Sequence, residues 1–312
     1  MITTEDLTKR YKSHLAVDGL NLHVRPGEIY GFLGPNGAGK TTTIHMLLNL
    51  TQPTSGRIAL FGAPLAPGDF HFKRAIGVVA EEPFEASQMT GWEMVRFFAG
   101  LYGVDAPTRW MEELFRQLDL WDVRHGLARD YSRGMRQKLS IIRALVHEPK
   151  LLILDEPVSG LDPHGIRQVR ELIHDYHQHG GTVFISSHIL SEIERSADRI
   201  GILHQGRLLV EDTLVGLRGR LTQNQKCVIE LETVPEGLLA RLKSASYVLD
   251  LSREGRQINA TLRAQADARS RLSRLIADAG GVILKMQSEE MSLEEAFVTI
   301  TSQNVVQLAG VA

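Results

Sequence analysis

Cysteine is almost absent from this chain, since its 312 residues contain only Cys227. A single cysteine excludes an internal disulfide framework and suits a reducing compartment. An excess of charge is also absent, because 35 lysines and arginines face 37 aspartates and glutamates, which leaves a net charge of −2. This balance gives no electrostatic case for binding nucleic acid or an anionic membrane surface. We therefore expect no nucleic-acid partner.

Long apolar runs are missing as well. No segment approaches the roughly 18 apolar residues of a membrane-spanning helix, and residues 1–6 are acidic and lack the apolar core of a signal peptide. With 43% hydrophobic residues, the chain can still bury a sizeable core. We expect a soluble protein that reaches a membrane only through a partner.

A glycine-rich phosphate-binding pattern, G-x-x-x-x-G-K-[ST], stands at residues 34–41, between an apolar strand-like run and a helix-like segment. Such glycines let backbone N–H groups turn toward a polyphosphate, which the helix N-terminus also favours. The alternative without a ligand is a tight glycine-rich turn between a strand and a helix. We favour a nucleotide loop, in which Lys40 supplies charge and the Thr41 hydroxyl can ligate Mg²⁺. The predicted nucleotide-binding residues of the loop are Gly34, Pro35, Asn36, Gly37, Ala38, Gly39, Lys40, Thr41 and Thr42.

Two apolar runs further along end in polar side chains. Residues 151–156 end in Asp155 and Glu156, and residues 181–188 end in His188. Runs without polar alternation suit strands that are buried on both faces of a parallel sheet, whose ligands bind at the carboxyl ends. Asp155 is thus placed to hold Mg²⁺, Glu156 to orient or deprotonate an attacking water, and His188 to reach a γ-phosphate. The alternatives are a capping pair of acids and a structural histidine.

The segment between these regions is helical in pattern. Apolar residues between about 90 and 147 recur at helical spacing, and residues 131–139 open a helix with Ser132 as a good N-cap. This helix is either an ordinary amphipathic helix or a second anion site.

Tyr11, upstream of the glycine loop, could stack on an adenine ring or simply pack against a strand.

The pattern after residue 221 is different and predicts β-α-β-β-α-β, the ferredoxin-like order, followed by a helix at 293–300. We therefore divide the chain into an ATP-binding domain at 1–221, with a helical subdomain at about 84–149, and a C-terminal accessory domain at 222–312. The core expected for the second domain includes Val228, Ile229, Leu231, Leu272, Leu275 and Ile283.

Taken together, these motifs resemble the ATP-binding subunit of an ABC transporter, in the branch that pairs with ABC-2-type permeases. The glycine loop, residues 131–135, 151–156, 159–162 and 187–188 carry the resemblance, which spans about two-thirds of the chain in the family's order. The resemblance implies an α/β fold, with a P-loop NTPase sheet, a helical insertion and a small α+β ferredoxin-like domain. Residues 291–297 resemble the accessory domain of that branch more weakly.

The family resemblance also implies a mechanism. Two copies would dimerise head to tail around ATP and Mg²⁺, and hydrolysis would power a membrane permease, with export favoured. The subunit would be cytoplasmic, peripheral on the inner face of the cell membrane through that permease. The resemblance implies that Glu156 is the general base and that His188 contacts the γ-phosphate. Thr41, Asp155 and Glu81 would bind the metal ion, and Tyr11 would stack on the adenine ring. Ser132, Arg133, Gly134 and Met135 would act in trans on the partner's nucleotide, and Asp162 would lie at the dimer seam.

The chain departs from the family pattern at three places, of which the last is Val158, where a threonine is common after Pro157. Glu81 stands where glutamine is usual; a carboxylate can bind Mg²⁺ but cannot donate a hydrogen bond. Arg133 and Met135 replace a glycine and a glutamine, which is familiar in the ABC-2 branch. The apolar residues Pro83, Phe84, Met89 and Trp92 follow Glu81, and we interpret this junction as the permease contact, although Trp92 could pack only within the insertion.

Two other functions remain possible from the sequence. A soluble ABC-type ATPase of the ribosome-associated kind usually carries two glycine loops, and one of the chromosome kind needs long coiled-coil arms; this chain has one loop and no sustained heptads. A nucleotide-sensing regulatory module would not need Glu156. The transported substrate is not encoded here.

Overall fold

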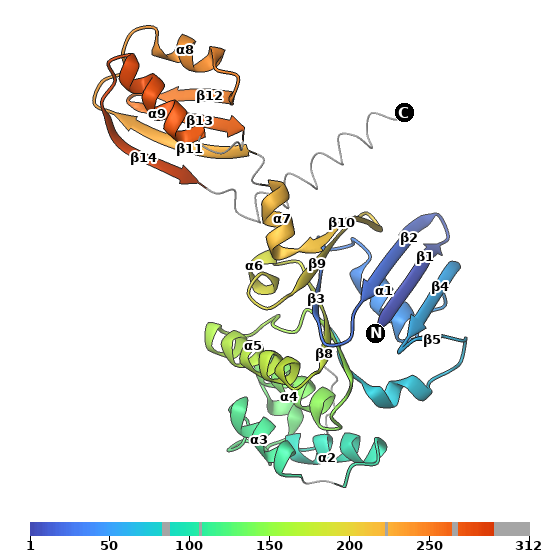
Figure 1. The fold of residues 1–312 in the computed structure, drawn as a ribbon. Helices are drawn as coiled ribbons and strands as arrows, with labels where there is room; N and C mark the ends of the chain where they lie inside the picture. Colours follow the sequence, from blue (N-terminus) through green and yellow to red (C-terminus); the bar gives the residue numbers. More distant parts are fainter. Residues whose placement is uncertain (83–87, 106–107, 222–223, 264–267, 290–312) are drawn as a thin grey trace. The chain divides into compact units, whose positions relative to one another are not determined.

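The computed structural model describes residues 1–82, 88–105, 108–221, 224–263 and 268–289 (Figure 1). It divides into two compact units, Met1–Leu214 and Val215–Ala312. The division falls at the start of helix α7 (Leu214–Leu221), whereas the sequence pattern predicts a boundary at the end of that helix. No helix within the described ranges combines the length and apolarity needed to cross a membrane.

The first unit is built on a six-stranded sheet. Its strand order is β10 (Arg207–Thr213), β9 (Arg199–His204), β3 (Ile29–Leu33), β8 (Thr182–Ser187), β7 (Leu151–Asp155) and β6 (Ile76–Val79). All neighbours are parallel except the β9–β10 hairpin. Every residue of β3, β7 and β8 is buried, as the unbroken apolar runs predict. The parallel strands therefore bring the ends of β3, β7 and β8 to one edge.

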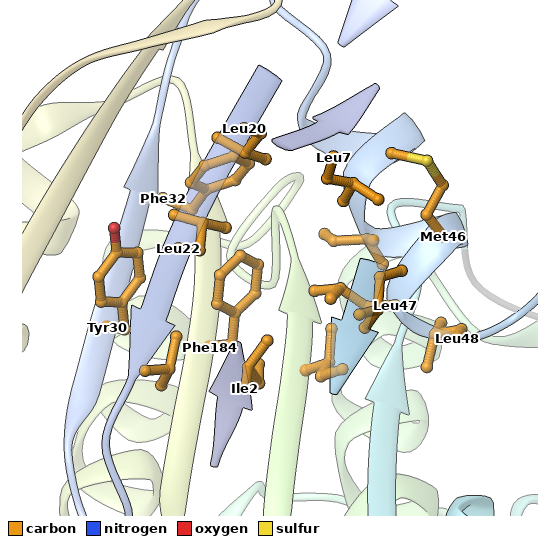
Figure 2. Packing of buried hydrophobic residues seen from close by; sticks show 14 of the residues in the cluster. Ile2, Leu7, Leu20, Leu22, Tyr30, Phe32, Met46, Leu47, Leu48 and Phe184 are labelled. Atoms are coloured by element: carbon orange, nitrogen blue, oxygen red, sulfur yellow. The ribbon is translucent and has the colours of Figure 1, made fainter. Parts of the chain in front are cut away.

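A second sheet has the order β2 (His14–Val24), β1 (Ile2–Tyr11), β4 (Ser55–Leu60) and β5 (Ala63–Pro64). Its strands run antiparallel. β1 continues to Tyr11 because register shifts absorb local irregularities, including Asp6 with φ of 46°. Side chains from this sheet, the central sheet and α1 (Lys40–Leu47) form one hydrophobic cluster, in which the Phe32 and Phe184 rings lie 5.2 Å apart (Figure 2).

The helical insertion consists of α2 (Gly91–Leu101), α3 (Arg109–Gln117) and α4 (Arg133–Leu145), with the short 3₁₀ turn Ala128–Asp130 before α4. Thr90, Thr108 and Ser132 cap these helices. Another 3₁₀ turn, His71–Ala75, precedes β6, and α5 (Pro163–Gln178) and α6 (Leu190–Ile193) flank β8. The α/β sheet with a helical insertion is thus confirmed.

The second unit has the elements β11 (Asn224–Leu231), α8 (Leu238–Ser244), β12 (Val248–Glu254), β13 (Gln257–Arg263), α9 (Ala268–Asp278) and β14 (Ile283–Glu289). Its sheet order, β12-β13-β11-β14, with antiparallel neighbours is the ferredoxin-like topology. Ile229, Leu231 and Leu272 lie in its core. The assignment of Val228 to this core was wrong, because it alternates with buried Cys227 and Ile229 and is only half-buried. The predicted helix at 293–300 lies outside the described residues.

Candidate nucleotide site

The glycine loop connects β3 to α1 at the carboxyl edge of the sheet. Gly37 and Gly39 have φ angles of +79° and +108°, which favour glycine. A side chain on Gly39 would collide with the carbonyl oxygen of Ala16 on β2. The loop is therefore shaped both by its own backbone and by the neighbouring sheet.

A cavity of about 320 Å³ opens over this loop. Its lining residues are Tyr11, His14, Ala16, Asn36, Gly37, Ala38, Gly39, Lys40, Thr41, Thr42, Glu81 and Glu156. The structure thus brings together most of the loop with three distant residues that the sequence analysis selected, Tyr11, Glu81 and Glu156. His14 and Ala16 were missed, because nothing in a β2 sequence pattern indicates which strand passes the loop.

Lys40 is held beside the loop that precedes it. Its Nζ donates to the carbonyl oxygens of Gly34, at 2.7 Å, and Pro35, at 3.4 Å. The same Nζ lies 3.3 Å from Glu156 Oε1, within ion-pair distance. Glu156 Oε1 is nonetheless buried without a hydrogen bond among the described residues. We conclude that this contact is electrostatic and poorly directed, so a phosphate or water could replace it.

Glu156 follows β7 in an unusual conformation, with φ of +48°. Its backbone N–H donates to the carbonyl oxygen and to Oγ of Ser186 on β8, both at 3.2 Å. Its Oε2 lies 2.9 Å from His188 Nδ1, and the His188 side chain is about 45% exposed. Because an ionised carboxylate only accepts, Nδ1 carries the hydrogen in this contact. His188 therefore touches the carboxylate directly while part of its ring remains exposed.

Asp155 faces a different environment from its neighbour. It is buried, and Ser186 Oγ donates a short hydrogen bond to its Oδ1. Asp155 is not among the residues that line the cavity. The nearby Glu192 carboxyl accepts a hydrogen bond from the Ser187 hydroxyl at 3.1 Å. Burial raises the pKa of this carboxyl, and the negative charge of Glu156 raises it further by a smaller amount.

The predicted trans-acting residues lie elsewhere in the chain. Ser132 caps α4, and its Oγ accepts from the Met135 N–H at 3.2 Å. Asp162 caps α5 by accepting from the Gly165 N–H at 2.8 Å. Among the described residues that line the cavity, none belongs to 131–135 or 159–162. A single chain thus does not bring these residues to its own cavity.

The donors around the cavity fit a hydrated Mg²⁺ better than a closed metal cage. Thr41 and Glu81 line it, and Asp155 lies at the end of the adjoining strand. In the described part of the chain, no three histidine, cysteine or acidic side chains gather to hold a metal. Mg²⁺ commonly takes one or two protein oxygens and completes its shell with phosphates and water.

A larger cavity, of about 750 Å³, lies at the opposite edge of the sheet, where β7 and β8 begin. Trp110 and Tyr176 line it, but their polar atoms donate to the carbonyl oxygens of Leu145 and Pro149. It contains none of the residues that the motifs select, so its size does not make it the nucleotide site.

Comparisons with known proteins identify relatives of this chain. A family model described as "ABC transporter" matches residues 17–159. The bacitracin transport ATP-binding protein BcrA of Bacillus licheniformis is 39% identical over 96% of this chain and 97% of its own length. The linearmycin resistance ATP-binding protein LnrL of Bacillus subtilis (strain 168) is 30% identical over 98% of this chain and 99% of its own length.

Solved structures show the same relationship. An ATP-binding subunit of an ABC transporter is 32% identical, with a TM-score of 0.66 over 71% of this chain and 93% of that one. A dimeric ATP-binding cassette with bound ADP and phosphate is 23% identical, with a TM-score of 0.64 over 69% of this chain and 99% of that one, and supports the fold alone. From the two relatives, the family model and the first of these structures, we conclude that the chain is an ATPase of the ABC transporter family.

Proposed function

We propose that this chain powers a permease that exports antimicrobial compounds from the cell. Support comes from relatives that match both units and are named for bacitracin transport and linearmycin resistance. The chain would sit on the cytoplasmic face of the membrane, held there by the permease. The sequence alternatives, a non-transport ATPase or a sensor, gain no support from these relatives.

The observation that carries the chemistry is the contact of Glu156 with both Lys40 and His188 at the edge of the nucleotide cavity. The loop N–H groups would bind the phosphates, and Lys40 would exchange Glu156 for the terminal phosphate, which is the stronger anion. The freed carboxylate would then accept a proton from the water that attacks the γ-phosphorus. The bond from that phosphorus to the β–γ bridging oxygen breaks, and ADP and phosphate leave.

His188 has a supporting role in this scheme. Its Nδ1–H hydrogen bond fixes the Glu156 carboxylate and stabilises its negative charge before proton transfer. The exposed part of its ring can contact the phosphate being transferred. Thr41, Glu81 and Asp155 would hold Mg²⁺ directly or through water, and the ion would neutralise phosphate charge.

A head-to-tail homodimer would complete the site. The α4 N-terminus, with Ser132, Arg133, Gly134 and Met135, does not line the cavity of its own chain. A helix N-terminus presents N–H groups and a favourable potential to an anion. In a second copy these groups would close over the nucleotide, with Asp162 at the seam and Tyr11 stacked on the adenine ring.

A comparison of the purified chain with Glu156→Gln tests this function. We expect the variant to bind ATP, to lose hydrolysis by about 100-fold or more, and to accumulate an ATP-dependent dimer in size-exclusion chromatography. Glu171→Gln, which changes an exposed glutamate, is the matched control. Wild-type turnover in the Glu156 variant would contradict the assigned role. Stimulation of ATP hydrolysis by membranes that contain a co-expressed permease would separate transport from the alternatives.

A further inference from the structure

We infer that Arg133 is a positioning residue for hydrolysis, which ties the first turn of α4 to the turn that carries Glu156. We call residues 156–161 the glutamate turn. Arg133 is the first residue of α4, where a positive charge opposes the helix dipole. Helix stability therefore does not explain an arginine at this place. The inference rests on the proposed role of Glu156.

The side chain of Arg133 lies along the glutamate turn. Its Nη2 donates to Ser159 Oγ at 3.1 Å. Its stem occupies the space beside Gly160, since a Cβ built there would lie 2.9 Å from both Cδ and Nε of Arg133. Gly160 has φ of +76° and no side chain, so it both shapes the turn and admits the arginine.

Ser159 connects this contact to Glu156. Its backbone N–H donates to the Glu156 carbonyl oxygen at 3.1 Å, while its hydroxyl accepts from Arg133. Glu156 itself has φ of +48°, a conformation that costs free energy for a residue with a side chain and persists only when neighbours hold it. Two hydrogen bonds that meet at Ser159 therefore connect Arg133 to the backbone that aims the carboxylate.

A second contact from α4 reaches the same turn. Gln137 Nε2 donates to the Pro157 carbonyl oxygen at 3.0 Å, and Gln137 is 1% exposed. Arg133 and Gln137 are four residues apart and so lie on one face of the helix. The helix end that would complete the partner's site thus also holds this chain's own Glu156. In the proposed dimer, nucleotide binding at the partner's site would therefore affect the position of this chain's Glu156 through Arg133 and Gln137.

The test uses the full chain with Arg133→Ala, Ser159→Ala, the double variant and Arg133→Lys. Arg129→Ala is the control, because Arg129 is half-exposed and its ion pair is with its neighbour Asp130. We expect each alanine variant to lower kcat about three- to ten-fold, the range of one lost hydrogen bond. The affinity of the single chain for ATP should not change, because neither Arg133 nor Ser159 lines its own cavity. The double variant should be no slower than either single one, and lysine should restore part of the rate.

Amide hydrogen exchange provides a readout that does not depend on turnover. Both single variants should speed exchange in residues 156–161, and Arg129→Ala should not. Unchanged exchange and kcat in Arg133→Ala would overturn the inference. So would a loss of kcat in Arg133→Ala that Ser159→Ala does not share, since Arg133 would then act on another group. If the wild-type chain hydrolyses ATP no faster than Glu156→Gln, the proposed function fails, while exchange still decides the Arg133 contact.

Discussion

The ammonium group of Lys40 lies 3.3 Å from Glu156 Oε1, and both side chains are less than one-tenth exposed. The charge proposed to bind phosphate and the carboxylate proposed to activate water thus form a buried ion pair. Removing one member of such a pair leaves the other charge uncompensated. Nucleotide binding and the release of Glu156 are therefore two aspects of one exchange of partners.

Lys40→Ala should weaken ATP binding, because it removes the charge that faces the phosphates. It should also destabilise the first unit, and breaking a buried pair typically costs about 3–5 kcal/mol. The remaining His188 contact should reduce that cost. Isothermal titration and thermal unfolding would measure both effects. In Lys40→Ala/Glu156→Gln both charges are gone, so stability should partly return; a further loss of stability would contradict the coupling.

The stability of the first unit should fall as the pH is lowered through about 6.5, partly because of His147. Burial lowers the pKa of His147, whose ring stacks on Tyr102 at 3.8 Å and whose Nε2 lies 3.2 Å from the Ile76 carbonyl oxygen. The unfolded chain binds the proton more readily, so stability is complete above the unfolded pKa and declines below it. His147→Phe should flatten the slope of unfolding free energy between pH 7 and pH 5. His174→Phe, at an exposed position, should leave the slope unchanged.

A chain that ends at Leu221 should fold and bind ATP with an affinity close to that of the full chain. The cavity residues all precede residue 157, and the two units have separate hydrophobic clusters. ATP titration and circular dichroism of the shortened chain would test this. A folded shortened chain that binds no nucleotide would show that the division between the units is misplaced.

Met89→Glu should uncouple transport while sparing basal ATP hydrolysis. The backbone at Met89 is fixed by the Ala128 N–H, which donates to its carbonyl oxygen at 2.8 Å, and its side chain is half-buried near the insertion. Pro83 and Phe84, the other members of the expected permease contact, lie outside the described residues. Transport and ATPase activity measured in one reconstituted sample would decide; equal loss of both would indicate misfolding.

Trp92 is a sequence candidate for the same contact, but its neighbours favour a packing role. Its ring lies 5.3 Å from the Phe115 ring and 5.9 Å from the Trp121 ring. These contacts tie α2 to α3 and to the segment before α4. We therefore expect Trp92 to stabilise the helical insertion rather than to contact the permease.

The sequence predicts features whose cause is local. An unbroken apolar run is enough to predict β7 and β8, and glycines followed by Lys40 and Thr41 are enough to predict the loop before α1. The pairing of Lys40 with Glu156 depends on strand order, and the contact of Arg133 with Ser159 depends on how a helix end meets a turn. Neither of these two contacts produces a periodic pattern in the sequence from which it could be predicted. The boundary at Leu214 is equally hidden, because α7 shows no marked amphipathic pattern.

The turn between β9 and β10 rests on the glycine loop itself. The Gly206 N–H donates to the Ala38 carbonyl oxygen at 2.9 Å, and the Asp18 N–H donates to the Gly206 carbonyl oxygen at 2.9 Å. From Gly206 the chain runs directly along β10 to Leu214, where the first unit ends. A movement of the loop on nucleotide exchange would thus pull on a short covalent tether to the accessory unit.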